Sequence, residues 1–111
     1  MMEEKVYRQL IDEVFRQIDA GFEGVDPDLA ESVFSQGTLT IVFRETTRLI
    51  LSPQTPVRQI WVAFKDRAWH FDLDEQTGKW MDDRGEGIEL YKLIADTARE
   101  TVGAKVSLFG N

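Results

Sequence analysis

Six carboxylates near the start of the chain have the spacing expected of a surface that binds cations: Asp12, Asp19, Glu23, Asp26, Asp28 and Glu31. At about 100° per residue, the first three fall within a narrow sector of a helix, well away from its apolar side chains. The other three continue through a turn and into the first strand. Carboxylate oxygens form a hard ligand set, which suits Fe²⁺, Mg²⁺, Ca²⁺ or Mn²⁺. The series lacks the EF-hand spacing and any His, so we expect exposed and weak binding.

The net charge of the chain is concentrated in this same segment. Residues 1–31 hold nine acids and three bases, which accounts for −6 of the total of −7. Two interpretations remain open: a solvated helix face, which is the usual place for unpaired acids, or a surface for a cation or a strongly basic protein. If the helix reaches Glu23, then Asp19 and Glu23 are like charges four residues apart, which repel each other. Acids in the last turn of a helix are also unfavourable, because they oppose the helix dipole. Such local conflicts often mark function.

A second candidate surface is the side of the sheet that alternation directs toward water, with Gln59, Trp61, His70 and Asp72. An exposed Trp is a residue type that anchors partner proteins; the alternative is that the tail or a loop covers Trp61. His70 is the only histidine, and no motif pairs it with a nucleophile or a second ligand. We therefore predict no catalytic residue, and a protein that is not an enzyme.

Length and composition exclude several other classes. The 111 residues predict one domain, 1–111, able to bury a modest core. A pI near 4.6 argues against nucleic-acid binding, which needs clustered Lys and Arg. The chain has no Cys, no apolar run long enough to cross a membrane, and no signal-like N-terminus. We expect a soluble cytoplasmic protein that binds neither nucleic acid nor membranes.

Hydrophobic periodicity predicts the elements that must hold these surfaces. Apolar residues at three- and four-residue steps predict a first helix, which Gly21, Gly24 and Pro27 should end. Pro53 and Pro56 indicate a loop. Short connections require antiparallel neighbours. The fold class is therefore α+β: a two-layer sandwich, with an antiparallel sheet and two helices packed on one face. The predicted helices cover about 3–20 and 86–101, and the strands include 38–43, 49–51, 57–65, 68–73 and a short one around Trp80.

Four segments together resemble the frataxin family, in particular its bacterial members. The strongest is PVRQIWVAF at 56–64, which is similar to the family's central strand with its exposed Trp at Trp61. The segments HFDL, GKWMDDRGE and GTLTIVF, at 70–73, 78–86 and 37–43, are also similar, and the similarity covers essentially the whole chain.

The resemblance implies a frataxin-like sandwich without catalytic activity, which binds ferrous iron weakly and modulates iron–sulfur cluster assembly. It implies that an acidic ridge docks on a basic patch of the cysteine desulfurase. It also implies that the exposed sheet face contacts the iron–sulfur scaffold protein or the desulfurase. By position, the ridge corresponds to Asp19, Glu23, Asp26, Asp28 and Glu31.

The chain departs from this pattern where Ala20 and Gly24 replace two of the acids paired at the end of the family's first helix. Docking therefore has more support than iron binding, because docking needs a field more than a coordination shell. The alternative is an acidic interaction module with no physiological metal role. Iron oxidation and storage is a less favoured possibility, because the chain lacks a buried Glu and His di-iron pattern.

Overall fold

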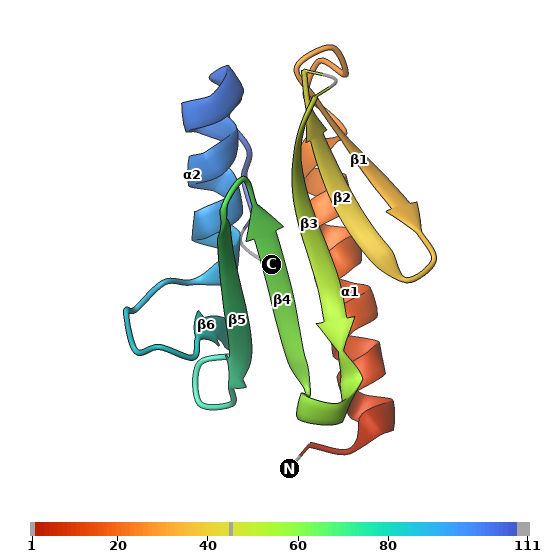
Figure 1. Cartoon of the computed structure of the whole chain (residues 1–111). Helices are drawn as coiled ribbons and strands as arrows, with labels where there is room; N and C mark the ends of the chain where they lie inside the picture. The colour runs from red at the N-terminus through yellow and green to blue at the C-terminus, as the bar shows by residue number, and fades with distance from the viewer. Residues whose placement is uncertain (1, 45, 109–111) are drawn as a thin grey trace.

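The structure, a computed structural model, describes residues 2–44 and 46–108. Two helices flank a run of six strands, with a short 3₁₀ helix between the third and fourth strands (Figure 1). In chain order the elements are α1 (Glu4–Phe22), β1 (Ala30–Ser35), β2 (Thr38–Phe43), β3 (Thr47–Gln54), η1 (Thr55–Val57), β4 (Gln59–Phe64), β5 (Arg67–Asp74), β6 (Lys79–Asp82) and α2 (Leu90–Val102).

The strands form one antiparallel sheet in the order β1-β2-β3-β4-β5-β6, so every strand pairs with its neighbour in sequence. Both helices lie on the same face of this sheet (Figure 1), and their apolar residues join those of the strands in a single core. Ile60 and Val62 are buried in that core, whereas Trp61 between them is exposed. The predicted α+β sandwich, with helices on one face and the other face open, is confirmed.

α1 forms because one of its faces is apolar. Tyr7, Ile11, Val14, Ile18 and Phe22 are all buried, at steps of three and four residues. The helix runs to Phe22, two residues beyond the predicted end, so Gly21 lies inside its last turn rather than after it.

Gly21 is explained by packing against the C-terminal tail rather than by helix termination. A Cβ atom at this position would clash with Leu108 Cδ2 and would lie 3.2 Å from Val106 Cγ1 and 3.3 Å from the carbonyl oxygen of Ser107. The tail therefore crosses α1 in close contact with its backbone. A helical Gly costs about 1 kcal/mol relative to Ala, and here it permits this approach.

α2 begins at Leu90, so the predicted start at Glu86 is wrong. The side chain of Glu89 caps the helix by accepting hydrogen bonds from the backbone N–H groups of Tyr91 and Lys92, at 2.8 and 3.0 Å. The preceding residues are held in a loop by Asp82, whose carboxylate accepts three backbone N–H bonds, from Arg84, Glu86 and Ile88.

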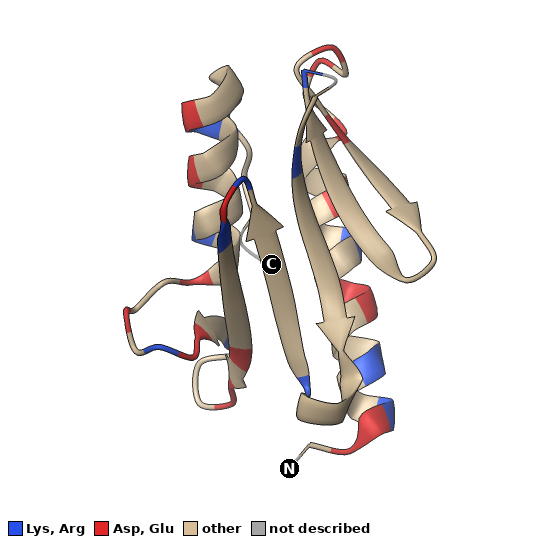
Figure 2. Cartoon of the chain, viewed as in Figure 1, with Lys and Arg blue, Asp and Glu red and all other residues tan. Residues whose placement is uncertain are grey.

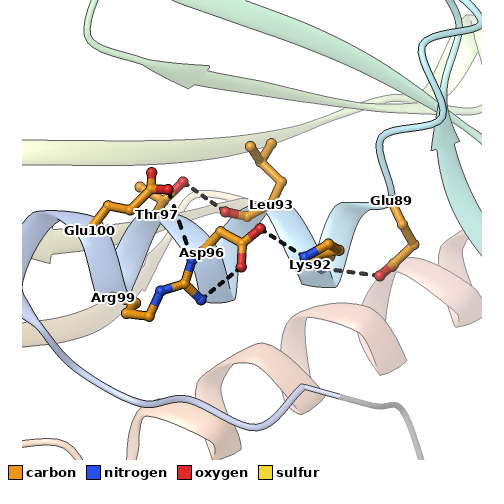
Figure 3. A network of polar contacts seen from close by, with 7 residues as sticks. All are labelled: Glu89, Lys92, Leu93, Asp96, Thr97, Arg99 and Glu100. Carbon is orange, nitrogen blue, oxygen red and sulfur yellow. Dashed lines mark hydrogen bonds and ion pairs between the residues drawn. The ribbon is translucent and has the colours of Figure 1, made fainter.

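Ion pairs along the exposed side of α2 support the helix locally (Figure 3). Asp96 accepts from Lys92 Nζ at 3.1 Å and from Arg99 Nη1 at 3.0 Å, pairs separated by four and three residues. These two contacts, Lys92 first, hold the pKa of Asp96 below its usual value. The charges of α2 thus pair with one another, whereas the last turn of α1 has acids and no base.

The loop predicted at Pro53 and Pro56 is only partly right. Pro56 lies in η1, but Pro53 is in β3, opposite Ile60 of β4. The pairing of β3 with β2 ends at Leu51. Pro53 therefore has a neighbouring strand on one side only, which is the position that a proline tolerates in a sheet.

Candidate functional site

The six predicted ridge carboxylates extend from the middle of α1, through the turn after it, to β1. We call them the acidic ridge (Asp12, Asp19, Glu23, Asp26, Asp28 and Glu31), and all six are exposed. Figure 2 shows acidic residues along α1 and in the loop that follows it, whereas the strands are largely uncharged. The last turn of α1 contains no basic residue. Because the carbonyl end of a helix is itself negative, these charges add to the field rather than being compensated.

The turn between α1 and β1 is built by one of the ridge acids. Asp26 Oδ1 accepts the backbone N–H of Asp28 at 2.9 Å, and the carbonyl of Asp26 accepts from Leu29 at 2.8 Å and from Ala30 at 3.1 Å. This side-chain-to-backbone bond is typical of Asp in turns. Asp26 thus positions β1 and has one carboxylate oxygen already engaged.

Three ridge acids surround one shallow hollow of about 250 Å³ between α1 and β1. Asp19, Glu23 and Glu31 line it together with Ser32, whose hydroxyl donates to Asp19 Oδ1. Phe22, Val25, Pro27 and Ala30 form its apolar wall. The fold therefore brings together residues that are twelve positions apart.

The other ridge acids do not line this hollow. Asp12 lies two helical turns before Asp19, roughly 10 Å along the axis at 1.5 Å per residue. Among the described residues, no three Asp, Glu or His side chains are close enough to form a ligand set for a metal ion. As arranged, the ridge is an extended anionic surface rather than a preformed coordination site.

The open face of the sheet carries a second organised cluster. Trp61 on β4 is 37% exposed, and the described part of the tail packs on the opposite, helical side. Its indole stacks on His70 of β5, with ring centroids 4.2 Å apart and 13° between the planes. Trp61 Nε1 donates to Gln59 Oε1 at 2.8 Å, so the exposed indole is held in place by two neighbours.

Gln59 joins this aromatic pair to two carboxylates. Its Nε2 donates to Asp72 Oδ1 at 3.0 Å and to Asp83 Oδ2 at 3.1 Å, and Asp83 Oδ2 lies 3.6 Å from His70 Nδ1. We call Gln59, Trp61, His70, Asp72 and Asp83 the open-face cluster. The four residues that alternation directs outward are thus brought together by the structure.

Asp83 is the member that sequence reasoning missed. It follows β6, and its backbone N–H donates to the carbonyl of His70 at 2.8 Å. That contact depends on the pairing of β6 with β5, and neither periodicity nor local spacing indicates it. The only available signal was the acidic pair that directly follows Trp80 and Met81.

The cluster is anchored from the helix side as well. The hydroxyl of Tyr7 on α1 donates to the carbonyl of Gln59 at 2.6 Å, which fixes the start of β4. Burial is the main cause that raises the pKa of the Tyr7 hydroxyl, so it remains a donor across the physiological range. The start of β4, which carries Gln59 and Trp61 of the open-face cluster, is therefore tied to α1.

With this geometry established, the family model described as a frataxin-like domain matches residues 1–104. The chain belongs to the frataxin family. The membership predicted from the four sequence segments is thus confirmed, and the open face and acidic ridge can be compared with other frataxins.

Several curated relatives align along nearly their full length. The iron–sulfur cluster assembly protein CyaY of Pseudomonas aeruginosa is 40% identical over 109 residues, covering 98% of this chain and 99% of the relative. The CyaY protein of Tolumonas auensis is 32% identical over 107 residues, covering 96% and 99%.

Solved frataxin structures share the fold. The frataxin of Psychromonas ingrahamii superimposes with a TM-score of 0.87 at 27% identity, covering 97% of this chain and 99% of that one. A trimeric yeast frataxin from Saccharomyces cerevisiae, complexed with ferrous iron, gives a TM-score of 0.68 at 22% identity, covering 94% and 89%.

In the part of the chain that the structure describes, neither helix has the length and apolar character needed to span a bilayer.

Proposed function

We propose that this frataxin acts in iron–sulfur cluster assembly by docking its acidic ridge on a basic surface of the cysteine desulfurase. The observation that carries the proposal is the uncompensated charge at the end of α1, where exposed acids continue into β1 without a base in the last turn. Support also comes from relatives that are named as iron–sulfur cluster assembly proteins. A field of one sign steers a complementary partner and fixes its orientation.

The open-face cluster supplies the second contact in this proposal, with the iron–sulfur scaffold protein or with the desulfurase itself. Trp61 is exposed yet held by Gln59 and His70. A pre-ordered aromatic side chain loses little entropy on binding, and such residues tend to dominate interface energetics. The acidic ridge lies on α1, the turn after it and β1, whereas the open-face cluster lies on β4, β5 and just after β6, so one frataxin can touch two partners at once.

Ferrous iron is the cargo in this proposal. Asp19, Glu23 and Glu31 around the hollow would hold it, with hard carboxylate oxygens that also suit other divalent cations. Because these oxygens are exposed and do not converge as a ligand set among the described residues, water must complete the coordination shell. Binding should therefore be weak, as expected for an ion that is passed on rather than retained.

A charge-reversal experiment tests the docking. Glu23→Lys, Asp28→Lys and Glu31→Lys together should weaken desulfurase binding by at least tenfold at low salt, while the fold is kept because all three side chains are exposed. Asp26 is left intact because it builds the turn. The matched control reverses three exposed acids outside the ridge, Glu3, Asp66 and Glu86, with the same change in net charge. Equal loss of binding in both triple variants would contradict a localised ridge.

Iron loading is tested separately by NMR of the labelled chain with anaerobic Fe²⁺. We expect paramagnetic broadening confined to residues 12–31, and no broadening there would remove iron from the proposal.

The second candidate function, an acidic interaction module without a metal role, is favoured by the absence of a converged ligand set among the described residues. It predicts desulfurase binding that does not require iron and that weakens with salt. A cytoplasmic location and the lack of catalytic activity remain parts of the proposal.

A further inference from the structure

The two edges of the sheet differ in how they are covered. At the outer edge of β6, Met81 forms an antiparallel bridge with Glu89, so the loop before α2 covers that edge of the sheet. At the opposite edge, β1 pairs only with β2, and no further strand lies beyond it in the part of the chain that the structure describes (Figure 1). β1 is therefore the open edge.

The register identifies which backbone groups of β1 point away from the sheet. The N–H of Arg44 donates to the carbonyl of Leu29 at 3.0 Å, which makes these two residues a hydrogen-bonded pair. Hydrogen-bonded pairs alternate along an antiparallel ladder. The N–H and C=O groups of Glu31 and Val33 thus face β2, whereas those of Ser32 and Phe34 face outward.

The side chains of β1 are those of an unprotected edge. Phe34 is 63% exposed on the helix side, where its ring meets the edge of Phe15 at a centroid distance of 6.1 Å, and Val33 is 44% exposed on the open face. Edges that avoid pairing usually carry Lys, Pro or a bulge. The β1 sequence, AESVFS, has no Lys or Pro, and its register with β2 is unbroken.

Charge determines which partner suits this edge. The acids flank β1 on both sides near its start: Glu31 belongs to the strand itself, and Asp19 reaches it through Ser32. A second copy of the chain would bring two acidic ridges together, which is unfavourable. A segment that carries Lys or Arg beside apolar residues matches the acids at one end of β1 and the exposed Val33 and Phe34 at the other.

We propose that β1 accepts an extended, basic and apolar segment of the partner protein as an additional strand of the sheet. This inference rests on the proposed function, because it specifies how the partner that the ridge attracts is held. Main-chain hydrogen bonds from Ser32 and Phe34 supply affinity in such strand addition, and the flanking side chains supply specificity.

Amide hydrogen exchange of the ¹⁵N-labelled chain, alone and with purified bacterial cysteine desulfurase at low salt, tests the proposal. The N–H groups of Ser32 and Phe34 should exchange at least tenfold more slowly in the complex, whereas Glu31 and Val33, already bonded to β2, should change little. If the complex forms but the N–H groups of Ser32 and Phe34 exchange as fast as in the free chain, strand addition is overturned and the proposed docking is not. Failure to form any complex overturns the proposed function as well. Slowing in the free chain with rising concentration would identify a second copy as the occupant, which also overturns the proposal.

Two substitutions at Phe34 distinguish the contribution of its backbone N–H to binding from that of its side chain. Phe34→Ala removes the ring and keeps the outward N–H, whereas Phe34→Pro removes both, at a position where its missing N–H does not break the ladder with β2. We expect Phe34→Pro to bind the desulfurase at least tenfold more weakly than Phe34→Ala. Equal affinities of the two folded variants would overturn the proposal. The exchange experiment on the unmodified chain decides the question if Phe34→Pro does not fold.

Discussion

The indole of Trp61 lies flat against the imidazole of His70, with centroids 4.2 Å apart. Stacking on one side and a hydrogen bond to Gln59 on the other keep a large aromatic side chain exposed and ordered. An exposed Trp without such support loses rotamer freedom when it binds. This pair is therefore the clearest sign of a pre-formed contact on the open face.

Trp61→Ala should weaken binding of the scaffold protein or the desulfurase by about 2 kcal/mol, roughly thirtyfold in Kd. The unfolding midpoint should change little, because the side chain lies outside the core. Isothermal titration calorimetry measures the affinity. Ala68→Ser, a small change at an exposed position of β5, is the control and should bind normally. An affinity within threefold of the unmodified chain with both partners would contradict the role of Trp61.

Asp82 should make the stability of the chain depend on pH in the acid range. Backbone N–H bonds, that of Glu86 first, hold the pKa of Asp82 below its usual 3.8. A lowered folded-state pKa contributes stability that is present above the unfolded pKa and is lost as pH falls through the folded value. Asp82→Asn should therefore be less stable than the unmodified chain at pH 7, and the difference should shrink below about pH 4. Urea unfolding at several pH values measures this, and a constant difference would contradict it.

Tyr91 should make the stability of the chain depend on pH in the alkaline range. Burial first, then the charges of Glu89 and Glu13, raise its pKa to about 12. A raised folded-state pKa contributes stability that is complete below the unfolded pKa near 10 and is lost as pH rises through the folded value. Between about pH 10 and 12 the unmodified chain should lose stability relative to Tyr91→Phe. Spectrophotometric titration of both chains should show that the phenol lost in Tyr91→Phe is one that ionises near 12. Loss of a phenol that ionises near the ordinary value of about 10 would contradict the assignment.

Gly21→Ala tests the contact between α1 and the C-terminal tail. Helix propensity favours Ala by about 1 kcal/mol, but the added Cβ would meet Leu108, Val106 and the backbone of Ser107. Overpacking typically costs about 1–3 kcal/mol, so we expect a net loss of roughly 1 kcal/mol in the free energy of unfolding. The measurement is urea unfolding.

The control for this prediction is the same substitution in a Leu108→Ala background. Removing the nearest methyl group should make Gly21→Ala neutral or stabilising, which a double-mutant cycle reports as coupling between the two positions. An unchanged effect in both backgrounds would show that the tail does not press on α1.

Hydrophobic periodicity predicted the helix and sheet layers well, because a helix or strand with one buried face repeats its apolar residues at its own period. The apolar steps from Tyr7 to Phe22 and the alternation of Ile60, Trp61 and Val62 each define a face without any knowledge of the partner element. Antiparallel order followed from the short connections alone. The acidic ridge was visible for a similar reason, since its residues are local in sequence.

The features that were missed depend on contacts between distant segments. Asp83 joins the open-face cluster only through the β5–β6 pairing, and Ser32 meets Asp19 only because β1 folds back beside α1. The start of α2 was placed too early because Asp82 holds residues that a helical pattern would otherwise include. Gly21 looked like a helix stop because nothing local indicates Leu108.

The tail contact has a consequence for the ridge that lies above it. Gly21 stands between Asp19 and Glu23, so the last described residues of the chain press on the same turn that presents the acids. A change at Val106 or Leu108 can therefore alter the spacing of carboxylates that it never touches. Residues at the far end of the sequence thus help to set how rigidly the protein presents its charge to a partner.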